Sequence, residues 1–300
     1  MSNFLTTFRG ELAALLAAAF WTISSVLYSR LGQRISPFQL TVIKGTLAIA
    51  MILMTLGLRG MLVPEIPTFS LLFLALSGII GISWGDTAFF QTLNRLGPRR
   101  TLLVQTLAPS LTALLAAIFL GELLTILDIC GIGLILFGVT WVVGDRVGET
   151  STEAQNISEG VVWGAIAALS HAGGAILSRA ALAETTTSPL SAALVRLVAG
   201  VVVLPLWMLW LPAERRVEWK PVRSGRIWGI LIVAAFIGTY LAIWLQQTSL
   251  KFAPAGISQT LSATSPLFVL PIAAWTGEKI GIRAVLGAIA AVAGVSLLFA

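Results

Sequence analysis

The strongest constraint on this chain is a series of long apolar segments that leaves little polar sequence between them. The segments span residues 11–31, 37–57, 69–93, 100–120, 125–144, 160–182, 189–211, 226–249, 254–275 and 281–299. Each is long enough for a helix to cross a hydrocarbon core about 30 Å thick, which takes roughly 20 residues. Only 11% of the 300 residues are charged, less than half the share in soluble domains. The sequence therefore predicts an all-α integral membrane protein with ten transmembrane helices.

The second half of the chain repeats the first. The matched pairs include Pro98 and Pro254, Gly121-Glu122 and Gly277-Glu278, and Ser36-Pro37 and Ser188-Pro189. Lys44 and Arg196 also match, because each lies seven residues after the proline of its Ser-Pro pair. Matches that preserve glycine, proline and charge indicate an internal duplication. We expect a first repeat over residues 1–144, a polar linker over 145–159 and a second repeat over 160–300.

The number of helices in each half has a geometric consequence. Five helices per repeat is an odd number, so the second repeat lies upside down in the membrane relative to the first. Inverted repeats are typical of secondary transporters, in which the substrate site lies near the bilayer midplane between the repeats. The duplication therefore favours transport by alternating access.

Two proline-to-Gly-Glu helices, Pro109 through Glu122 and Pro266 through Glu278, carry a family resemblance. With the aromatic-polar first helix and the glycine-bearing fifth helix, they resemble the EamA family of the drug/metabolite transporter superfamily over nearly the whole chain. The resemblance implies ten helices in two repeats and transport, often export, of amino acids or related metabolites. The chain departs from the pattern at Ser170-His171, where an aromatic pair is expected.

Four ionisable side chains lie inside the predicted helices, where charge is costly and a functional role is the first hypothesis. Lys44 and Arg196 are candidates to hold an anionic or zwitterionic substrate; snorkelling toward a membrane interface or pairing across helices is the alternative interpretation. Asp86 has no acidic counterpart in the second repeat, and it either binds a substrate ammonium, exchanges a proton or neutralises Lys44. His171 is a second candidate for proton coupling, because histidine changes charge near neutral pH; a hydrogen bond between helices is the alternative.

Aromatic side chains in the middle of the predicted helices are candidates for the walls of a substrate cavity. They are Trp21, Trp84, Tyr240 and Trp244. Packing and anchoring at the membrane interface are the alternatives for each of them. Glu122 and Glu278 are expected to cap or pin the loops that follow them, and the fifth and tenth helices to form a close contact between the repeats.

The distribution of basic residues bears on orientation. Excluding Lys44 and Arg196, the predicted loops on the side of the amino terminus hold 4 lysines and arginines, and the opposite loops hold 13. The positive-inside rule therefore places both termini outside the cell, whereas the family resemblance implies cytoplasmic termini. The two arguments disagree.

Several function classes are disfavoured by the sequence. Basic residues are scattered between apolar runs, which indicates loops facing the lipid headgroups and not a surface for nucleic acid. One histidine and one cysteine, His171 and Cys130, leave no multidentate metal site, and we expect no cofactor. We predict a multi-pass transporter of the cell membrane that acts on small molecules, possesses no enzymatic activity and uses a proton gradient or the substrate gradient. The predicted cargo is an amino acid or related zwitterion; a hydrophobic amine drug or another metabolite is the alternative, and an intramembrane enzyme or a channel is less favoured.

Overall fold

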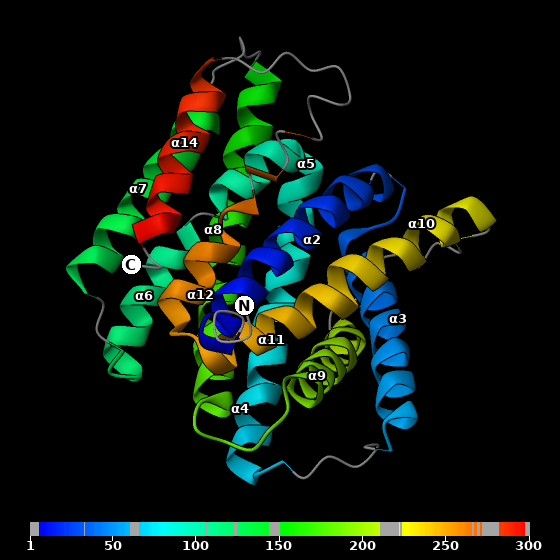
Figure 1. Cartoon of the computed structure of the whole chain (residues 1–300). Coiled ribbons are helices and arrows are strands. Elements are labelled where there is room, and N and C mark those ends of the chain that lie inside the picture. The colour runs from blue at the N-terminus through cyan, green and yellow to red at the C-terminus, as the bar shows by residue number, and fades with distance from the viewer. Residues whose placement is uncertain are drawn as a thin grey trace.

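The computed structural model describes residues 6–32, 34–60, 66–105, 107–122, 125–143, 151–210, 222, 224–265, 267–268, 271 and 282–297. Within these residues the fold consists of helices and contains no strand (Figure 1). The first repeat contains α2 (Arg9–Leu31), α3 (Pro37–Leu58), α4 (Thr68–Gly78), η1 (Ile79–Asp86), α5 (Thr87–Val104), α6 (Leu107–Phe119) and α7 (Ile126–Val143). The second contains α8 (Ser151–Leu182), α9 (Pro189–Trp210), α10 (Gly225–Ala235), η3 (Phe236–Leu241), α11 (Ala242–Phe252), α12 (Ala255–Ser262) and α14 (Ile282–Leu297).

Seven helical spans in the described part of the chain are long and apolar enough to cross a membrane. They cover Arg9–Leu31, Pro37–Leu58, Thr68–Pro98, Arg100–Phe119, Ile157–Leu182, Pro189–Leu206 and Gly225–Phe252. The expectation of ten spanning helices is thus confirmed for seven. The segments expected at 125–144 and 281–299 contain α7 and α14, and the one at 254–275 is helical over α12, its remainder lying partly outside the described residues.

Local sequence explains where the helices begin. Ser36 precedes α3, its hydroxyl accepts a hydrogen bond from the Gln39 amide at 3.2 Å, and Pro37 occupies the first helical position. Ser188 does the same for α9, accepting from the Ser191 amide at 3.1 Å. A side-chain cap followed by proline satisfies a free amide and presets the first turn. The repeated Ser-Pro pair is therefore a duplicated helix start.

The third membrane span of each repeat contains a π-helical stretch at the same place. In the first repeat α4, η1 and α5 as far as Pro98 form one span, and in the second α10, η3 and α11 form another. Shifted by 156 residues, the separation between the matched Pro98 and Pro254, residues 79–86 of η1 fall on 235–242, which enclose η3. π-Helical turns frequently occur at functional sites. The duplication extends to this irregular backbone.

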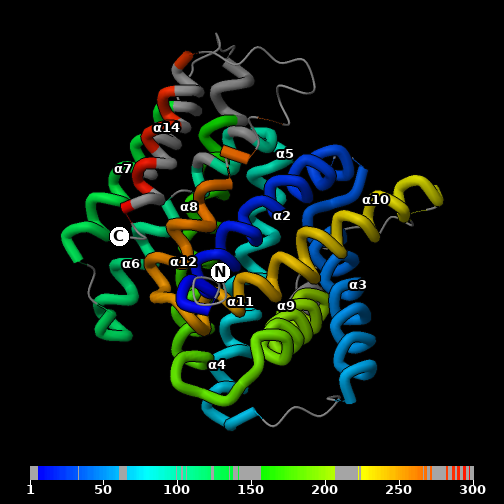
Figure 2. The backbone as a smooth tube through the Cα atoms, viewed as in Figure 1, coloured from blue at the N-terminus to red at the C-terminus, as the bar shows by residue number. Residues whose placement is uncertain are grey.

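Packing between the helices follows the two-fold repeat. The first helix of each half packs on the third span of the other half, α2 on α11 and α8 on α5. In Figure 2 the blue α2 runs beside α11. Equivalent helices also meet in pairs: α3 with α9, α6 with α12, and α7 with α14, which lie side by side in Figure 1. The expected contact between the fifth and tenth helices is confirmed, and the two halves form one interlocked bundle.

Small residues permit the closest of these contacts. A Cβ atom on Gly78 would lie 2.1 Å from the carbonyl oxygen of Arg196, so the end of α4 and α9 touch through their backbones. The Ser77 hydroxyl donates to the Gly174 carbonyl at 2.5 Å, and the Ser83 hydroxyl donates to the Gly200 carbonyl at 2.6 Å. Serine and glycine at helix interfaces serve this purpose in membranes. They fix α4 and η1 against α8 and α9.

Two features near the chain connections differ from expectation. Helix α8 begins at Ser151, so residues 151–159, expected in the linker, are helical; residues 145–150 lie outside the described residues. Glu122 was expected to pin the loop that follows it. Its carboxylate instead accepts a hydrogen bond from the Ala255 amide at 2.7 Å and thereby caps α12 of the other repeat. Pro266, Gly277 and Glu278 lie outside the described residues.

Candidate functional site

A cavity lies between the two repeats. It encloses about 1000 Å³ not occupied by protein atoms, part of it open to solvent, and both repeats contribute side chains. The lining residues with polar or aromatic groups are Trp21, Ser24, Ser25, Tyr28, Lys44, Asp86, Phe89, Phe90, Gln105, His171, Arg196, Gln246, Gln259, Ser262 and Ser265. A cavity lined by apolar and aromatic side chains with a few convergent polar groups suits a small organic molecule.

Asp86 is the centre of a polar cluster on one side of the cavity. Its Oδ2 atom lies 2.5 Å from Lys44 Nζ, and its Oδ1 atom lies 3.4 Å from His171 Nε2. The second ring nitrogen of His171 lies 3.1 Å from Gln105 Oε1. The cluster joins α3, η1, α8 and the turn that follows α5, segments that are far apart in the sequence. A carboxylate between a cation and a histidine can bind an ammonium group or relay a proton.

Glycine makes room for this cluster. A Cβ atom on Gly85 would lie 2.7 Å from His171 Cδ2, so any larger residue before Asp86 would displace the imidazole. Lys44 is 6% exposed, and its ammonium group also lies 5.2 Å from the centre of the Phe90 ring. A cation over an aromatic face gains further electrostatic stabilisation. Lys44 is thus held from two sides.

Arg196 lines the same cavity, but its neighbours differ from those of Lys44. It is 5% exposed, and its Nη1 atom lies 3.5 Å from Gln246 Oε1, at the limit of a hydrogen bond. The Nε atom of Arg196 is buried without a hydrogen-bond partner in the described residues. Gly81 faces the guanidinium: a Cβ atom there would lie 3.1 Å from Arg196 Nη2. The sequence pairs Lys44 and Arg196, but the structure gives only Lys44 a carboxylate.

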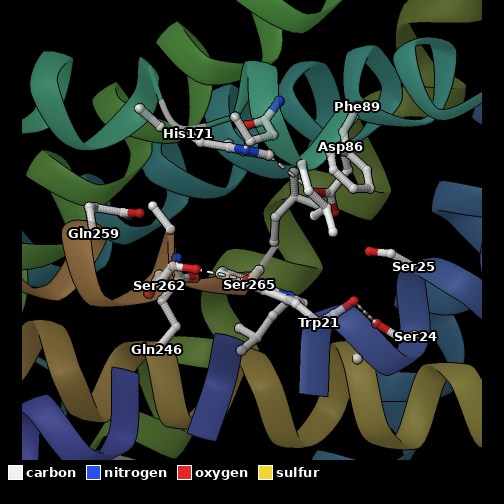
Figure 3. Close-up of a pocket in the computed structure, with 18 of the residues that line it drawn as sticks. Trp21, Ser24, Ser25, Asp86, Phe89, His171, Gln246, Gln259, Ser262 and Ser265 are labelled. Carbon is white, nitrogen blue, oxygen red and sulfur yellow. Dashed lines mark hydrogen bonds and ion pairs between the residues drawn. The ribbon is translucent and has the colours of Figure 1, made fainter. Parts of the chain in front are cut away.

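Aromatic rings form another part of the wall. Tyr28 and Phe90 meet edge to face with ring centres 5.3 Å apart. The Tyr28 hydroxyl lies 3.2 Å from the Thr239 hydroxyl of η3, which fixes the ring across the repeat boundary. Trp21 lies in the same wall, and Figure 3 shows it with Ser24 and Ser25 opposite Asp86 and His171. The cavity therefore combines an apolar aromatic surface with buried charge.

Hydroxyl and amide groups complete the lining. Gln259, Ser262 and Ser265 come from α12 and the turn after it, and Ser24 and Ser25 come from α2 (Figure 3). The serines and Tyr28 were not predicted as site residues. The serines could have been found from the sequence, because several small polar side chains occur inside segments that are otherwise apolar. Such side chains indicate a helix face that contacts other helices or a cavity and not lipid.

Five of the eight residues predicted from the sequence line the cavity: Trp21, Lys44, Asp86, His171 and Arg196. Three do not. Trp84 is 55% exposed, because the turn that brings Gly81 and Gly85 toward the bundle directs the intervening tryptophan outward. The Tyr240 hydroxyl bonds to Thr55 at 2.9 Å inside a packed cluster.

Trp244 is the third residue outside the lining. Its ring lies against Tyr240, with ring centres 6.2 Å apart, and the Arg59 guanidinium lies 5.4 Å from the centre of the Trp244 ring. The two aromatic residues of the second repeat therefore pack helices α3, η3 and α11 together. This packing role also explains why Tyr240 and Trp244 lie in the middle of an apolar segment.

Comparison with known proteins places these observations in a family. The EamA-like transporter family matches residues 8–144 and again residues 158–300. No curated protein matches the chain. A solved crystal structure, described only as that of a protein, has a TM-score of 0.77 at 19% sequence identity, covering 97% of this chain and 96% of that chain; this likeness shows the fold alone. Because the two family matches cover nearly the whole sequence, the chain belongs to the EamA-like transporter family.

Proposed function

We propose that this protein is a secondary transporter that exports small zwitterionic metabolites, amino acids or close relatives, by alternating access. One observation carries the proposal: the cavity between the repeats holds buried cations and a carboxylate beside an aromatic wall. An amino acid presents both charges and an apolar side chain, which are the features this lining complements. Membership of a transporter family favours this reading over an intramembrane enzyme.

The proposed substrate site contains the five cavity residues Trp21, Lys44, Asp86, His171 and Arg196. Charged groups are rare in membrane helices and mark substrate and ion pathways. A hydrophobic amine drug is the alternative cargo. It would use Asp86 and the aromatic wall, but it would bring a second positive charge toward Arg196.

Alternating access would expose this cavity to each side of the membrane in turn. The proposed moving units are the repeats, residues 1–144 and 160–300, which rock against each other around the cavity. The π-helical stretches η1 and η3 lie at equivalent places in the two units, and both contribute to the lining. They are suited to absorb local changes of helical twist as the halves move.

Asp86 and His171 are the proposed proton-coupling residues. His171 Nε2 lies 3.4 Å from Asp86 Oδ1, and His171 Nδ1 lies 3.1 Å from Gln105 Oε1. A proton that binds to one of these groups therefore changes the interactions of its neighbours. The sequence contains no P-loop, and a proton gradient or the substrate gradient is left to drive transport. The lipid bilayer of the cell membrane and small-molecule substrates are the partners this mechanism needs, with no cofactor.

Efflux from proteoliposomes tests the proposal. The experiment measures release of a labelled panel of amino acids and metabolites, with and without a pH gradient, for the wild type, Asp86→Asn and His171→Gln. Saturable efflux of a panel member that is stimulated by the gradient and lost in Asp86→Asn is the expected result. Efflux indifferent to pH and to both substitutions would contradict proton coupling. Folded protein that releases nothing from the panel would contradict transport of zwitterions.

A further inference from the structure

Both repeats carry a cation at equivalent positions, but only the first repeat carries the matching carboxylate. Lys44 and Arg196 occupy equivalent positions seven residues after their prolines. Asp86, the partner of Lys44, corresponds in the repeat register to Ala242. The second half of the cavity therefore contains the positive charge without the negative one. Arg196 forms no ion pair within the part of the chain that the structure describes.

The surroundings of Arg196 compensate its charge only in part, because Asp86 attracts the guanidinium without forming an ion pair with it. Gln246 offers an amide oxygen at 3.5 Å, and Arg196 Nε finds no acceptor among the described residues. The Asp86 carboxylate, which lines the same cavity, already interacts with Lys44 and His171. A cation with 5% exposure and no ion-pair partner in the described chain is costly in a membrane protein. A role in ligand binding would account for that cost.

A second unsatisfied donor faces the same space. Gln259 lines the cavity from α12, is 5% exposed and has a side-chain nitrogen without a hydrogen-bond partner in the described chain. Arg196 and Gln259 reach one cavity from two helices, and Arg196 Nε and the Gln259 side-chain nitrogen have no acceptor among the described residues. A carboxylate supplies two acceptor oxygens, and the planar guanidinium binds it through two parallel hydrogen bonds.

We infer that Arg196, assisted by Gln259, is the anchor for the carboxylate group of the transported substrate, and that Lys44 is not. This inference rests on the proposed transport function and narrows its substrate class to molecules that carry a carboxylate. Lys44 serves to hold Asp86 in place. The matched cations of the two repeats thus have different roles, and amines without a carboxylate are poor ligands.

The first arm of the test needs no ligand. Thermal unfolding of the purified full-length protein in detergent is compared for the wild type, Arg196→Met and Lys44→Met. Arg196→Met is expected to keep or raise Tm, because it removes a buried charge that has no ion-pair partner in the described chain. Lys44→Met is expected to lower Tm, because it leaves the Asp86 carboxylate without its lysine partner. A fall in Tm for Arg196→Met as large as that for Lys44→Met would show that the arginine is structural and would overturn the inference.

The second arm uses three matched probes: leucine, 4-methylpentanoate, which lacks the ammonium, and isoamylamine, which lacks the carboxylate. Saturating leucine and 4-methylpentanoate are expected to raise the wild-type Tm by about 2–4 °C, and isoamylamine to leave it unchanged. Arg196→Met should abolish the response to both carboxylates, and Gln259→Leu should weaken it. Stabilisation by isoamylamine alone, or by none of the three, would overturn the inference. Leucine that binds through Arg196 but is not released from proteoliposomes would leave the carboxylate anchor standing while the transport proposal fails.

Discussion

Glu122, three residues after the end of α6 in the first repeat, accepts a hydrogen bond from the backbone amide of Ala255, the first residue of α12 in the second repeat, at 2.7 Å. Its other carboxylate oxygen lies 2.5 Å from Arg179 Nε. Arg179 in turn donates to the carbonyl oxygens of Leu250 and Lys251, each at 3.0 Å. One carboxylate therefore connects α6, α8, α11 and α12 at a single end of the bundle.

This arrangement predicts that Glu122→Gln destabilises the protein. The variant keeps the shape of the side chain but removes the charge that holds Arg179 and favours the amino-terminal end of α12. We expect a loss of about 2 kcal/mol, measured as a fall of roughly 4 °C in Tm in detergent. Glu159→Gln is the matched control, because Glu159 is half exposed and lies 3.4 Å from Arg95. Equal effects of the two substitutions would refute a special role for Glu122.

The pair Lys44–Asp86 predicts strong coupling between two substitutions. Lys44→Met and Asp86→Asn each leave an unpaired charge in a buried place, and each is expected to cost about 3–5 kcal/mol. The double variant removes both charges, so its loss of stability should be smaller than the sum of the two single losses. Thermal unfolding of the four proteins measures the coupling. Additive losses would mean that the two groups do not stabilise each other.

Much of the fold could be predicted from residues that act locally. Ser36-Pro37 and Ser188-Pro189 mark helix starts by capping, which depends only on neighbouring residues. The repeat offset likewise identified equivalent helices. The π-helical stretches η1 and η3 could not be predicted, because their wider turns depend on packing against helices from the other repeat. The partner of Glu122 was missed for the same reason: Ala255 is distant in sequence and contacts it only after folding.

The ionisable residues of the candidate site could be predicted, because charged side chains are rare in membrane helices. All four intramembrane ionisable residues, Lys44, Asp86, His171 and Arg196, line the cavity. Aromatic residues were a weaker guide, because tryptophan and tyrosine also pack helices and face lipid. Which face of a helix a side chain occupies depends on the local turn, and near Trp84 that turn is π-helical, outside the ordinary helical period.

The contrast between two tryptophans gives a test of where the site lies. Trp21 lines the cavity, whereas Trp84 is 55% exposed on the outer surface of the bundle. We expect Trp21→Leu to lower the efflux rate at subsaturating substrate by about tenfold, since the lost ring contact corresponds to roughly 1.4 kcal/mol. Trp84→Leu should leave the efflux rate unchanged. A larger effect of Trp84→Leu than of Trp21→Leu would place the substrate path elsewhere.

The contact of Gly78 with Arg196 predicts that one added methyl group disrupts both packing and the site. A Cβ atom on Gly78 would lie 2.1 Å from the Arg196 carbonyl oxygen, and backbone atoms cannot rotate away as a side chain can. Gly78→Ala must separate the end of α4 from α9, which displaces Arg196 from the cavity wall. We expect a loss of about 1–3 kcal/mol in the free energy of unfolding, together with weaker binding of carboxylate probes.

Gly229→Ala is the matched control for this prediction, because a Cβ atom on Gly229 would meet no atom within 4 Å. Gly229 is an exposed residue in the interior of α10, where alanine is favoured over glycine by up to about 1 kcal/mol. The same substitution should therefore raise Tm at one glycine and lower it at the other. Thermal unfolding of both variants measures the difference in sign. An unchanged or raised Tm for Gly78→Ala would show that α4 and α9 are not in backbone contact, and the position of Arg196 in the cavity would then lose its structural support.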